Sequence, residues 1–292
     1  MKISIIAPKK ISGTTEKLIN AAKEVFGDNN YELISINDLV VESSDKGINL
    51  IYEDKKLETD YALTRIDGKR LEHGYKIVSA LDKLGIPHPY NAETLRIAHD
   101  KFLTCLVLSN EKINVPKTFS VRSISSLKKI SKSLTYPAIV KLLSGSGGKG
   151  VIFVEDAEQL VNVCESIKES NQEIVVQEFI PNPGCDIRIL VVNSKVIAGM
   201  KRIAKKGDVR ANVSRGGKAV NFDPSDDIKE IALKSAEILN AEILAVDIIV
   251  GNDEVPRVIE VNVNPGIRGL EKATDKNVAK AIMLEIKEMM KR

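Results

Sequence analysis

Two acids and an amide occupy consecutive apolar segments near the end of the sequence. Residues 243–266 contain two β-branched runs joined by a short polar connector, which is the pattern of an antiparallel strand pair. Side chains alternate between faces along a strand, so Glu260 and Asn262 share one side. Pairing about residues 252–253 places Asp247 roughly opposite Glu260. Three oxygen ligands are therefore predicted to converge on one patch.

These ligands indicate a hard cation. Two carboxylates on an apolar hairpin repel each other and lose hydration unless a positive charge compensates them. Magnesium is usually held by one or two carboxylates together with substrate phosphates, and no nearby His or Cys favours zinc or copper. The alternative is a strand pair with a solvated polar face, and the pattern alone leaves it open.

The composition indicates an ordinary globular protein with a local rather than a global charge bias. The 292 residues are 43% hydrophobic and 28% charged, and the formal net charge of +3 requires no nucleic-acid or membrane partner. The three cysteines show no CxxC spacing, and no apolar run approaches the roughly 18 residues of a membrane span. The N-terminal apolar run is too short for a signal peptide. We expect a reduced, cytoplasmic location.

The order of the expected elements divides the chain into three parts. Residues 1–91 alternate strands with helices, which predicts a small parallel α/β unit. Residues 92–175 form a second lobe that begins with one helix over about 92–109, and residues 176–292 form a third. The expected strands lie at about 2–7, 31–36, 61–66, 117–121, 137–143, 151–155 and 173–180, and further helices at about 14–26, 69–84, 123–133, 225–240 and 277–290.

A glycine-rich segment, residues 144–150, lies between two expected strands. Its spacing matches the dinucleotide-binding GxGxxG, but a strand rather than a helix follows, and the Walker A pattern also fails. A kinase glycine loop would need downstream HRD and DFG triplets, which the sequence lacks. A hairpin lid whose N–H groups cover phosphates, with Lys141 on the preceding strand, remains. A glycine-rich turn without a ligand is the alternative.

Further candidates follow in the third part. Glu178, Phe179 and Ile180 end a strand where the chain passes between lobes, so their backbone groups could meet an adenine edge. Asp186 and Arg188 share a strand face, which suits either a ligand role or a surface ion pair. Residues 201–218 carry seven cations without interleaved aromatics, which favours phosphates and carboxylates over nucleic acid.

Taken together, these motifs resemble the ATP-grasp ligases, and more narrowly the RimK-type glutamate ligases. The resemblance covers about residue 92 to the C-terminus, and residues 1–91 share only the architecture. Asn264 stands where the family usually has Ser. The matching motifs are Asp100-Lys101, Lys141 before SGSGGKG, QEFI at 177–180, CDIR at 185–188, the basic run through GDVRAN and RGG, VIEVN at 258–262, Pro265-Gly266 and GLEKAT at 269–274.

The resemblance implies a mixed α/β, three-lobed architecture in which two lobes clasp ATP behind an N-terminal parallel α/β domain. It assigns the metal ligands Asp247, Glu260 and Asn262 to two Mg²⁺ ions, for which Mn²⁺ could substitute. The remaining roles are ATP phosphates (Lys101, Lys141, Gly147, Gly148), adenine and ribose (Gln177, Glu178, Phe179, Ile180, Asp186), the γ-phosphate and acyl phosphate (Arg210, Asn212) and substrate anions (Arg202, Arg215).

The implied reaction joins a carboxylate to an amine through an acyl phosphate, with release of ADP. L-glutamate, or a similar amino acid, would be added to an acidic acceptor: a protein C-terminus, a peptide or a coenzyme. Arg65 and Arg70 are the N-terminal candidates for that acceptor, although a strand-end ion pair fits them equally well. His73 is predicted to be a surface or packing residue, and no residue is assigned as the base that deprotonates the amine.

Other readings remain open at this point. The basic run could belong to a nucleotide or nucleic-acid binding module without turnover, and a carrier-protein ligase of lysine or arginine biosynthesis is a further option within the ligases. We expect no membrane or nucleic-acid partner. A homo-oligomer, either a dimer or a tetramer, is compatible with the sequence, which does not fix the state.

Overall fold

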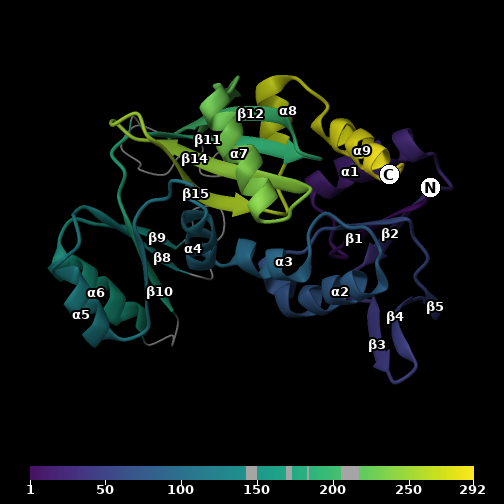
Figure 1. Cartoon of the computed structure of the whole chain (residues 1–292), viewed down its shortest axis with the longest axis horizontal. Coiled ribbons are helices and arrows are strands. Elements are labelled where there is room, and N and C mark those ends of the chain that lie inside the picture. The colour runs from purple at the N-terminus through teal and green to yellow at the C-terminus, as the bar shows by residue number, and fades with distance from the viewer. Residues whose placement is uncertain (143–149, 169–172, 183, 205–216) are drawn as a thin grey trace.

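The chain folds into three lobes, which the computed structural model describes except for residues 143–149, 169–172, 183 and 205–216. The N-terminal lobe and the central lobe lie at opposite ends of the long axis, and the C-terminal lobe lies above and between them (Figure 1). Among the described helices, none is both long and apolar enough to cross a membrane. The three-lobed α/β architecture expected from the sequence is confirmed.

The N-terminal lobe is built on a parallel sheet with the strand order β2-β1-β6. Its edge carries an antiparallel unit, β3-β4-β5, that the sequence analysis did not predict. The helix α2 ends where predicted, at Gly85, whose φ of 64° suits a residue without a Cβ. The elements are β1 (Ile3–Ala7), α1 (Gly13–Phe26), β2 (Tyr31–Ser35), β3 (Val40–Ser44), β4 (Gly47–Tyr52), β5 (Lys55–Lys56), β6 (Tyr61–Thr64), η1 (Gly68–Arg70) and α2 (Leu71–Leu84).

The central lobe is an antiparallel sheet of order β7-β10-β8-β9, packed against α5 and α6. The predicted boundary between residues 175 and 176 falls inside β10, which pairs with β7 and β8 in this sheet. The elements are α3 (Ala92–His99), α4 (Lys101–Asn110), β7 (Thr118–Val121), α5 (Ile124–Ser131), β8 (Ala138–Leu142), β9 (Val151–Val154), α6 (Ala157–Lys168) and β10 (Ile174–Glu178).

The single helix predicted for residues 92–109 is wrong, because Asp100 divides it into α3 and α4. The Asp100 backbone is extended, and its carboxylate accepts hydrogen bonds from the N–H groups of Phe102 and Leu103. An acid that caps a new first turn is more stable there than inside a continuous helix. This cap places Lys101 at the very start of α4.

The C-terminal lobe is an antiparallel sheet of order β13-β12-β11-β14-β15. The strands β14 and β15 form the hairpin predicted from the two apolar runs, with a register shift after Asp247. The elements are β11 (Cys185–Val192), β12 (Lys195–Ile203), β13 (Lys218–Asn221), α7 (Asp226–Ile238), β14 (Ile243–Val250), β15 (Pro256–Asn262), α8 (Arg268–Thr274) and α9 (Val278–Met289).

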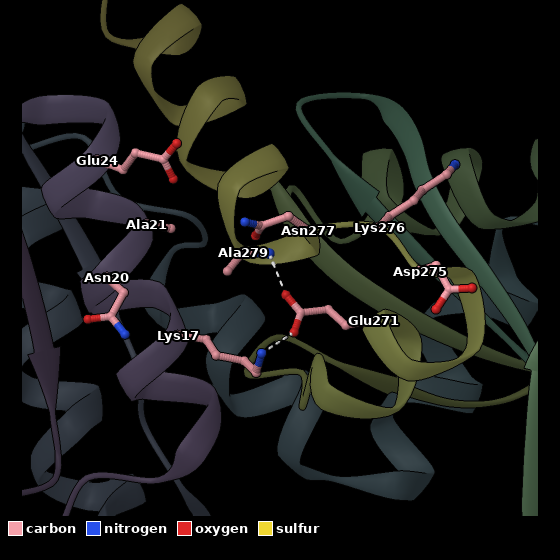
Figure 2. A pocket seen from close by; sticks show the side chains of 9 residues that line it. All are labelled: Lys17, Asn20, Ala21, Glu24, Glu271, Asp275, Lys276, Asn277 and Ala279. Carbon is pink, nitrogen blue, oxygen red and sulfur yellow. Dashed lines mark hydrogen bonds and ion pairs between the residues drawn. The ribbon is translucent and has the colours of Figure 1, made fainter.

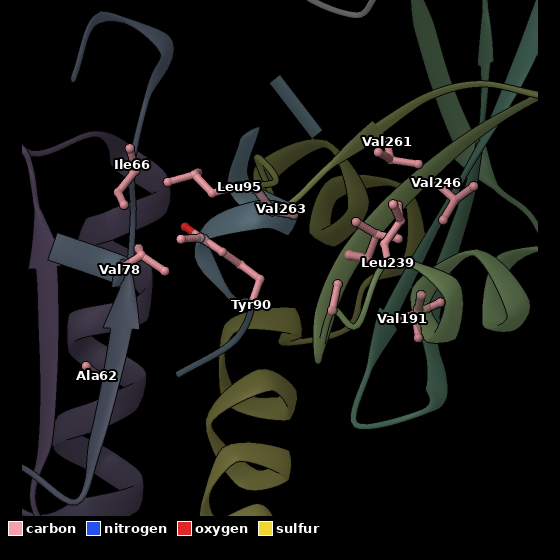
Figure 3. Packing of buried hydrophobic residues seen from close by; sticks show 14 of the residues in the cluster. Ala62, Ile66, Val78, Tyr90, Leu95, Val191, Leu239, Val246, Val261 and Val263 are labelled. Carbon is pink, nitrogen blue, oxygen red and sulfur yellow. The ribbon is translucent and has the colours of Figure 1, made fainter. Parts of the chain in front are cut away.

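One hydrophobic core joins the N-terminal and C-terminal lobes. Figure 3 shows Tyr90 between N-terminal side chains such as Ile66 and Val78 and C-terminal ones such as Leu239. The Tyr90 side chain is 1% exposed, and its hydroxyl donates to the Thr64 carbonyl. A shared core of this kind fixes the N-terminal sheet against the sheet and helix α7 of the C-terminal lobe.

A second contact joins the same two lobes on the other face of the N-terminal sheet, where α1 meets α8 and α9. Figure 2 shows Glu271 reaching both Lys17 of α1 and the start of α9. Its Oε2 lies 2.8 Å from Lys17 Nζ, and its Oε1 accepts the Ala279 N–H at 3.1 Å. The N-terminal lobe is thus held to the C-terminal lobe on both faces of its parallel sheet.

Candidate active site

A cleft of about 720 Å³ opens between the end of the N-terminal sheet and β15. One wall is the segment that follows β6, the opposite wall is the second half of β15 with its exit, and α3 and α4 close the floor. Its lining residues are Ile66, Asp67, Gly68, Lys69, Leu71, Ala98, His99, Lys101, Thr104, Ile259, Glu260, Val261, Asn262, Val263 and Asn264. The cleft therefore brings together residues from all three lobes.

The predicted metal ligands lie on and behind the β15 wall. Asp247 pairs with Glu260 across the hairpin, close to the predicted arrangement, and a register shift after Asp247 that the sequence analysis did not predict produces this pair. Glu260 is exposed and Asn262 is half-buried, and both line the cleft. Asp247 is only 3% exposed and lies behind them on β14.

Asp247 is held by two arginines, which the charge argument from the sequence did not foresee. Arg188 donates from Nε to Oδ1 and from Nη2 to Oδ2, each at 2.7 Å. Arg202 Nη2 donates to Oδ2 at 2.9 Å, and Arg202 Nε also donates to Asp186. Two acids and two guanidiniums thus form one largely buried network, and a metal ion is not needed to compensate Asp247.

The network shifts the pKa of each carboxyl in a direction that its partners explain. Burial raises the pKa of Asp247, but Arg188 and Arg202 outweigh it and hold that pKa at about 2. For Asp186 burial wins, and its pKa lies above the usual value although Arg202 opposes the shift. Burial lowers the pKa of Arg202, yet Asp247 and Asp186 raise it overall. Asp247 is therefore a permanent anion at neutral pH.

The oxygens that remain fit a magnesium ion. Among the described residues, Asp247 Oδ2 already accepts two hydrogen bonds, whereas Oδ1 accepts only the one from Arg188. Asn262 Oδ1 accepts the Asn264 N–H at 2.8 Å, which leaves it one further acceptor direction. Together with the exposed carboxylate of Glu260, these atoms provide two carboxylates and one amide oxygen, which are hard ligands of the kind that bind Mg²⁺. The described residues hold no group of three or more His, Cys, Asp and Glu side chains suited to a metal.

The contacts of Arg202 and Asp186 differ from the roles that the resemblance assigned to these two residues. Arg202, predicted to bind substrate anions, is 4% exposed and is occupied by Asp186 and Asp247. Asp186, predicted to meet the ribose, is occupied by Arg202. The predicted alternative, a surface ion pair between Asp186 and Arg188, is also wrong, because each pairs with a different and more buried partner.

Two lysines approach the metal-ligand strand from the central lobe. Lys101 lines the cleft, and Lys141 Nζ lies 3.4 Å from the Ile259 carbonyl of β15. Burial lowers the pKa of Lys141, while Glu260 is the largest influence that raises it. The structure therefore brings Lys101 into the cleft and Lys141 against β15, the strand that carries Glu260 and Asn262.

The residues at the strand end predicted to meet adenine already have partners within the protein. Gln177 is 4% exposed, and its amide donates to Thr118 Oγ1 at 2.8 Å, inside the lobe. The Phe179 ring packs edge-on against Phe153, and the Ile180 carbonyl accepts from Asn182. Glu178 Oε2 accepts the Lys117 N–H at 3.2 Å. Gly147, Gly148, Arg210, Asn212 and Arg215 lie outside the described residues.

His99 is a cleft residue to which the sequence analysis gave no role. Its Nδ1 donates to the Leu95 carbonyl at 2.9 Å, so Nε2 keeps its lone pair. Burial lowers its pKa, which Asp67 raises and Lys101 lowers to smaller extents. Its position directly before Asp100-Lys101 was the available signal. By contrast, His73 Nε2 contacts the Leu39 carbonyl outside the cleft, in line with its predicted packing role.

Comparisons with known proteins agree with this geometry. A sequence model of the RimK-like ATP-grasp domain matches residues 98–286. A protein named probable alpha-L-glutamate ligase from Maridesulfovibrio salexigens is 32% identical over 284 residues, 96% of this chain and 93% of the relative. One of the same name from Cellvibrio japonicus is 29% identical over 294 residues, 100% of this chain and 97% of the relative.

Solved structures show the same fold. The ATP-grasp ligase PsnB, solved with a phosphomimetic variant of its minimal precursor, Mg and ADP, has a TM-score of 0.76 at 14% identity. The match covers 100% of this chain and 99% of the PsnB chain. The fold and the cleft thus define an ATP-grasp enzyme. More narrowly, the chain belongs to the RimK-like ATP-grasp family, and it is an ATP-dependent, ADP-forming ligase. The binding module without turnover is thereby set aside.

Proposed function

We propose that this ligase adds L-glutamate, or a closely similar amino acid, to an acidic acceptor through an acyl-phosphate intermediate. The names of the relatives from Cellvibrio japonicus and Maridesulfovibrio salexigens support glutamate as the amino acid. The observation that carries the proposal is the cleft itself, where Glu260 and Asn262 face Lys101 with Asp247 behind them. The acceptor is a protein C-terminus, a peptide or a coenzyme.

In the first step an acceptor carboxylate attacks the γ-phosphorus of ATP, which forms an acyl phosphate and releases ADP. The amino-acid nitrogen then attacks the acyl carbon, the C–O bond to phosphate breaks, and the amide forms. Neither step needs a protein nucleophile, so the side chains act by positioning and by charge. Lys101 and Lys141 would hold phosphate oxygens, as would Arg210 and Asn212, with Arg215 at a substrate anion.

Asp247, Glu260 and Asn262 would hold Mg²⁺, with Mn²⁺ as a possible substitute, and the metal when bound would neutralise charge on the phosphates. Arg188 and Arg202 fix the orientation of Asp247 for this role. The backbone around Glu178–Ile180 is proposed to meet the adenine, although the Glu178 N–H and the Ile180 carbonyl each already have a partner within the protein.

ADP release measured with ATP, Mg²⁺, L-glutamate and a peptide that ends in two glutamates tests the proposal. ADP should form only when both L-glutamate and the peptide are present, and mass spectrometry should show an added glutamyl residue. Glu260→Gln should lower the rate by about 100-fold or more, because a metal supplies several kcal/mol of charge stabilisation. Asp253→Asn, on the same hairpin but paired with Arg257 at the surface, is the matched control.

Two outcomes contradict the proposal in different ways. Turnover of Glu260→Gln at the wild-type rate would remove the metal assignment and leave the ligase intact. The absence of any glutamyl product, with this peptide and with a cell extract supplied with each amino acid in turn, would remove the proposed substrates.

A further inference from the structure

A second basic residue, Arg65, lies at the carboxyl end of the N-terminal sheet and outside the metal site. It is the first residue after β6, and its backbone N–H donates to the Ile6 carbonyl at the end of β1. In open parallel sheets, ligands bind in the crevice outside the carboxyl ends of the strands. Arg65 is therefore placed where this lobe would meet a substrate.

The Arg65 guanidinium is buried without a counter-charge. The residue is 7% exposed, and its Nη2 donates to the Pro265 carbonyl at 3.1 Å. Its Nε is buried and has no hydrogen-bond partner, and no carboxylate in the described part of the chain forms an ion pair with it. Burial lowers its pKa to about 10, so it is still a cation at neutral pH.

Arg70, five residues later, shows the ordinary alternative. Its Nη1 lies 2.6 Å from Asp67 Oδ2, and its Nε donates to Asn37 at 2.9 Å. The sequence could not separate the two arginines, but the structure makes Arg70 the strand-end ion pair and leaves Arg65 without one. A buried charge without a partner is costly, and groups retained at such a cost are characteristic of functional sites.

The first turn of α1 lies close to the segment that accepts the hydrogen bond of Arg65. Pro265, which accepts its hydrogen bond, precedes Gly266, and a Cβ on Gly266 would lie 4.0 Å from Thr14 Oγ1 in the first turn of α1. The Ser12 hydroxyl accepts a hydrogen bond from the Thr15 N–H, and the Ser12 carbonyl accepts one from the Glu16 N–H. Ser12 therefore provides no acceptor for the N–H groups of Gly13 and Thr14. The first 15 residues of the sequence contain no acid, and Arg268 lies beside Gly13 at the start of α1.

The same loop connects Arg65 to the reaction. Asn264 and Pro265 lie two and three residues after the proposed metal ligand Asn262, and Asn264 Nδ2 donates to the Ile66 carbonyl at 3.0 Å. The Oδ1 atom of Asn264 is buried and has no partner. Ile66 and Asn264, the chain neighbours of Arg65 and Pro265, line the cleft, so a carboxylate bound by Arg65 would lie beside the exit of β15.

We propose that Arg65 is a binding residue for a carboxylate of one of the two substrates of the ligase. The inference rests on the proposed function, because it takes an acidic acceptor and an amino acid as the substrates. The carboxylate belongs either to L-glutamate or to the acceptor, and the geometry is the same for both. Arg65 binds and positions this group and takes no part in the bond changes.

The test compares Arg65→Met, Arg65→Lys and the control Arg70→Met, with L-glutamate and a peptide ending in two glutamates as probes. Arg65→Met should raise KM by about 10- to 100-fold for one probe, the size of a lost hydrogen bond to a charged group. A rise for L-glutamate assigns the carboxylate to the amino acid, and a rise for the peptide assigns it to the acceptor. Arg65→Lys should recover part of the loss, and Arg70→Met should change neither KM.

Stability separates a binding role from a structural one. Because Arg65 has no counter-charge, Arg65→Met should unfold at the same or a higher urea concentration than the wild type. If Arg65→Met folds and leaves both KM values within twofold of wild type, the guanidinium only holds the two lobes together and the proposal is wrong. An unchanged KM for both probes in Arg65→Lys, together with a Met variant that does not fold, leads to the same conclusion.

A binding measurement that needs no turnover tests the carboxylate site independently of the proposed function. Glutarate, a simple dicarboxylate, should raise the thermal unfolding temperature of the wild type and of Arg70→Met but not that of Arg65→Met. If the wild type forms no ADP with any substrate pair and still shows this difference, the proposed function fails and the carboxylate site stands. Equal responses of all three proteins to glutarate overturn the site.

Discussion

Arg188 lies directly opposite Asp247 on the neighbouring strand and holds both oxygens of its carboxylate at 2.7 Å. This fork-to-fork geometry fixes the plane of the carboxylate as well as its charge. Arg202 adds a third bond from β12, two strands away from β14. The acid predicted to meet a metal is therefore oriented by the protein before any metal binds.

Loss of Arg202 should be strongly destabilising. Arg202→Ala leaves Asp186 with no guanidinium and Asp247 with one, both almost fully buried. Removing one partner from a buried ionic network costs about 3–5 kcal/mol, and urea unfolding measures the change. Arg257→Ala removes an ion pair with the exposed Asp253 and should change stability little. Equal urea midpoints for Arg202→Ala and the wild type would contradict the network.

The sequence predicted the hairpin and the approximate pairing of its strands because both are local, whereas the register shift after Asp247 was not predicted. The apolar runs, the connector and the alternation of faces are enough to place Asp247 roughly opposite Glu260. The partners of Asp247 could not be predicted this way, because they depend on β11 lying beside β14 and β12 beside β11. Strand order of this kind is set by packing between segments far apart in sequence.

The same limit applies to single residues near the cleft. Arg65 and Arg70 are equivalent basic residues in the sequence, and only the burial of the one and the Asp67 contact of the other distinguish them. The break at Asp100 was missed for the opposite reason. Its capping signal is local, but the apolar spacing on both sides continues the helical pattern across it.

Stability should fall below pH 6.5 in part because of His99. Burial lowers its folded pKa from 6.5, so the unfolded chain takes up a proton at a pH where the folded protein does not. The contribution of neutral His99 to stability is therefore fully present above pH 6.5. It is lost as the pH falls from 6.5 toward the pKa of His99 in the folded protein. Asp67 favours the charged form and Lys101 opposes it, both weakly compared with burial.

His99→Gln isolates this contribution. Urea unfolding of both proteins between pH 8 and pH 5 should show a stability difference, wild type minus variant, that becomes smaller as the pH falls. His73→Gln, in which the replaced ring contacts only the Leu39 carbonyl among its described hydrogen bonds, serves as the comparison. A difference that stays constant over this range would show that the His99 pKa is the same in the folded and unfolded states.

Glu271 should stabilise the junction of the two lobes through two separate contacts. Its side chain is 12% exposed, caps the Ala279 N–H at the start of α9 and pairs with Lys17 of α1 (Figure 2). Glu271→Ala should lower the free energy of unfolding by about 1–2 kcal/mol, the usual cost of a lost helix cap with a partly buried pair. Glu24→Ala, which removes the exposed Glu24–Lys280 pair between α1 and α9, should cost no more than about 0.5 kcal/mol.

Hydrogen exchange distinguishes the two contacts of Glu271. Loss of the cap should accelerate exchange of the Ala279 amide in Glu271→Ala and leave it slow in Lys17→Ala, because Lys17 touches only the other carboxylate oxygen. A double-mutant cycle between Glu271 and Lys17 then gives the ion-pair part alone. If Lys17→Ala frees the Ala279 amide to the same extent, the cap depends on the ion pair, and the two contacts act as one.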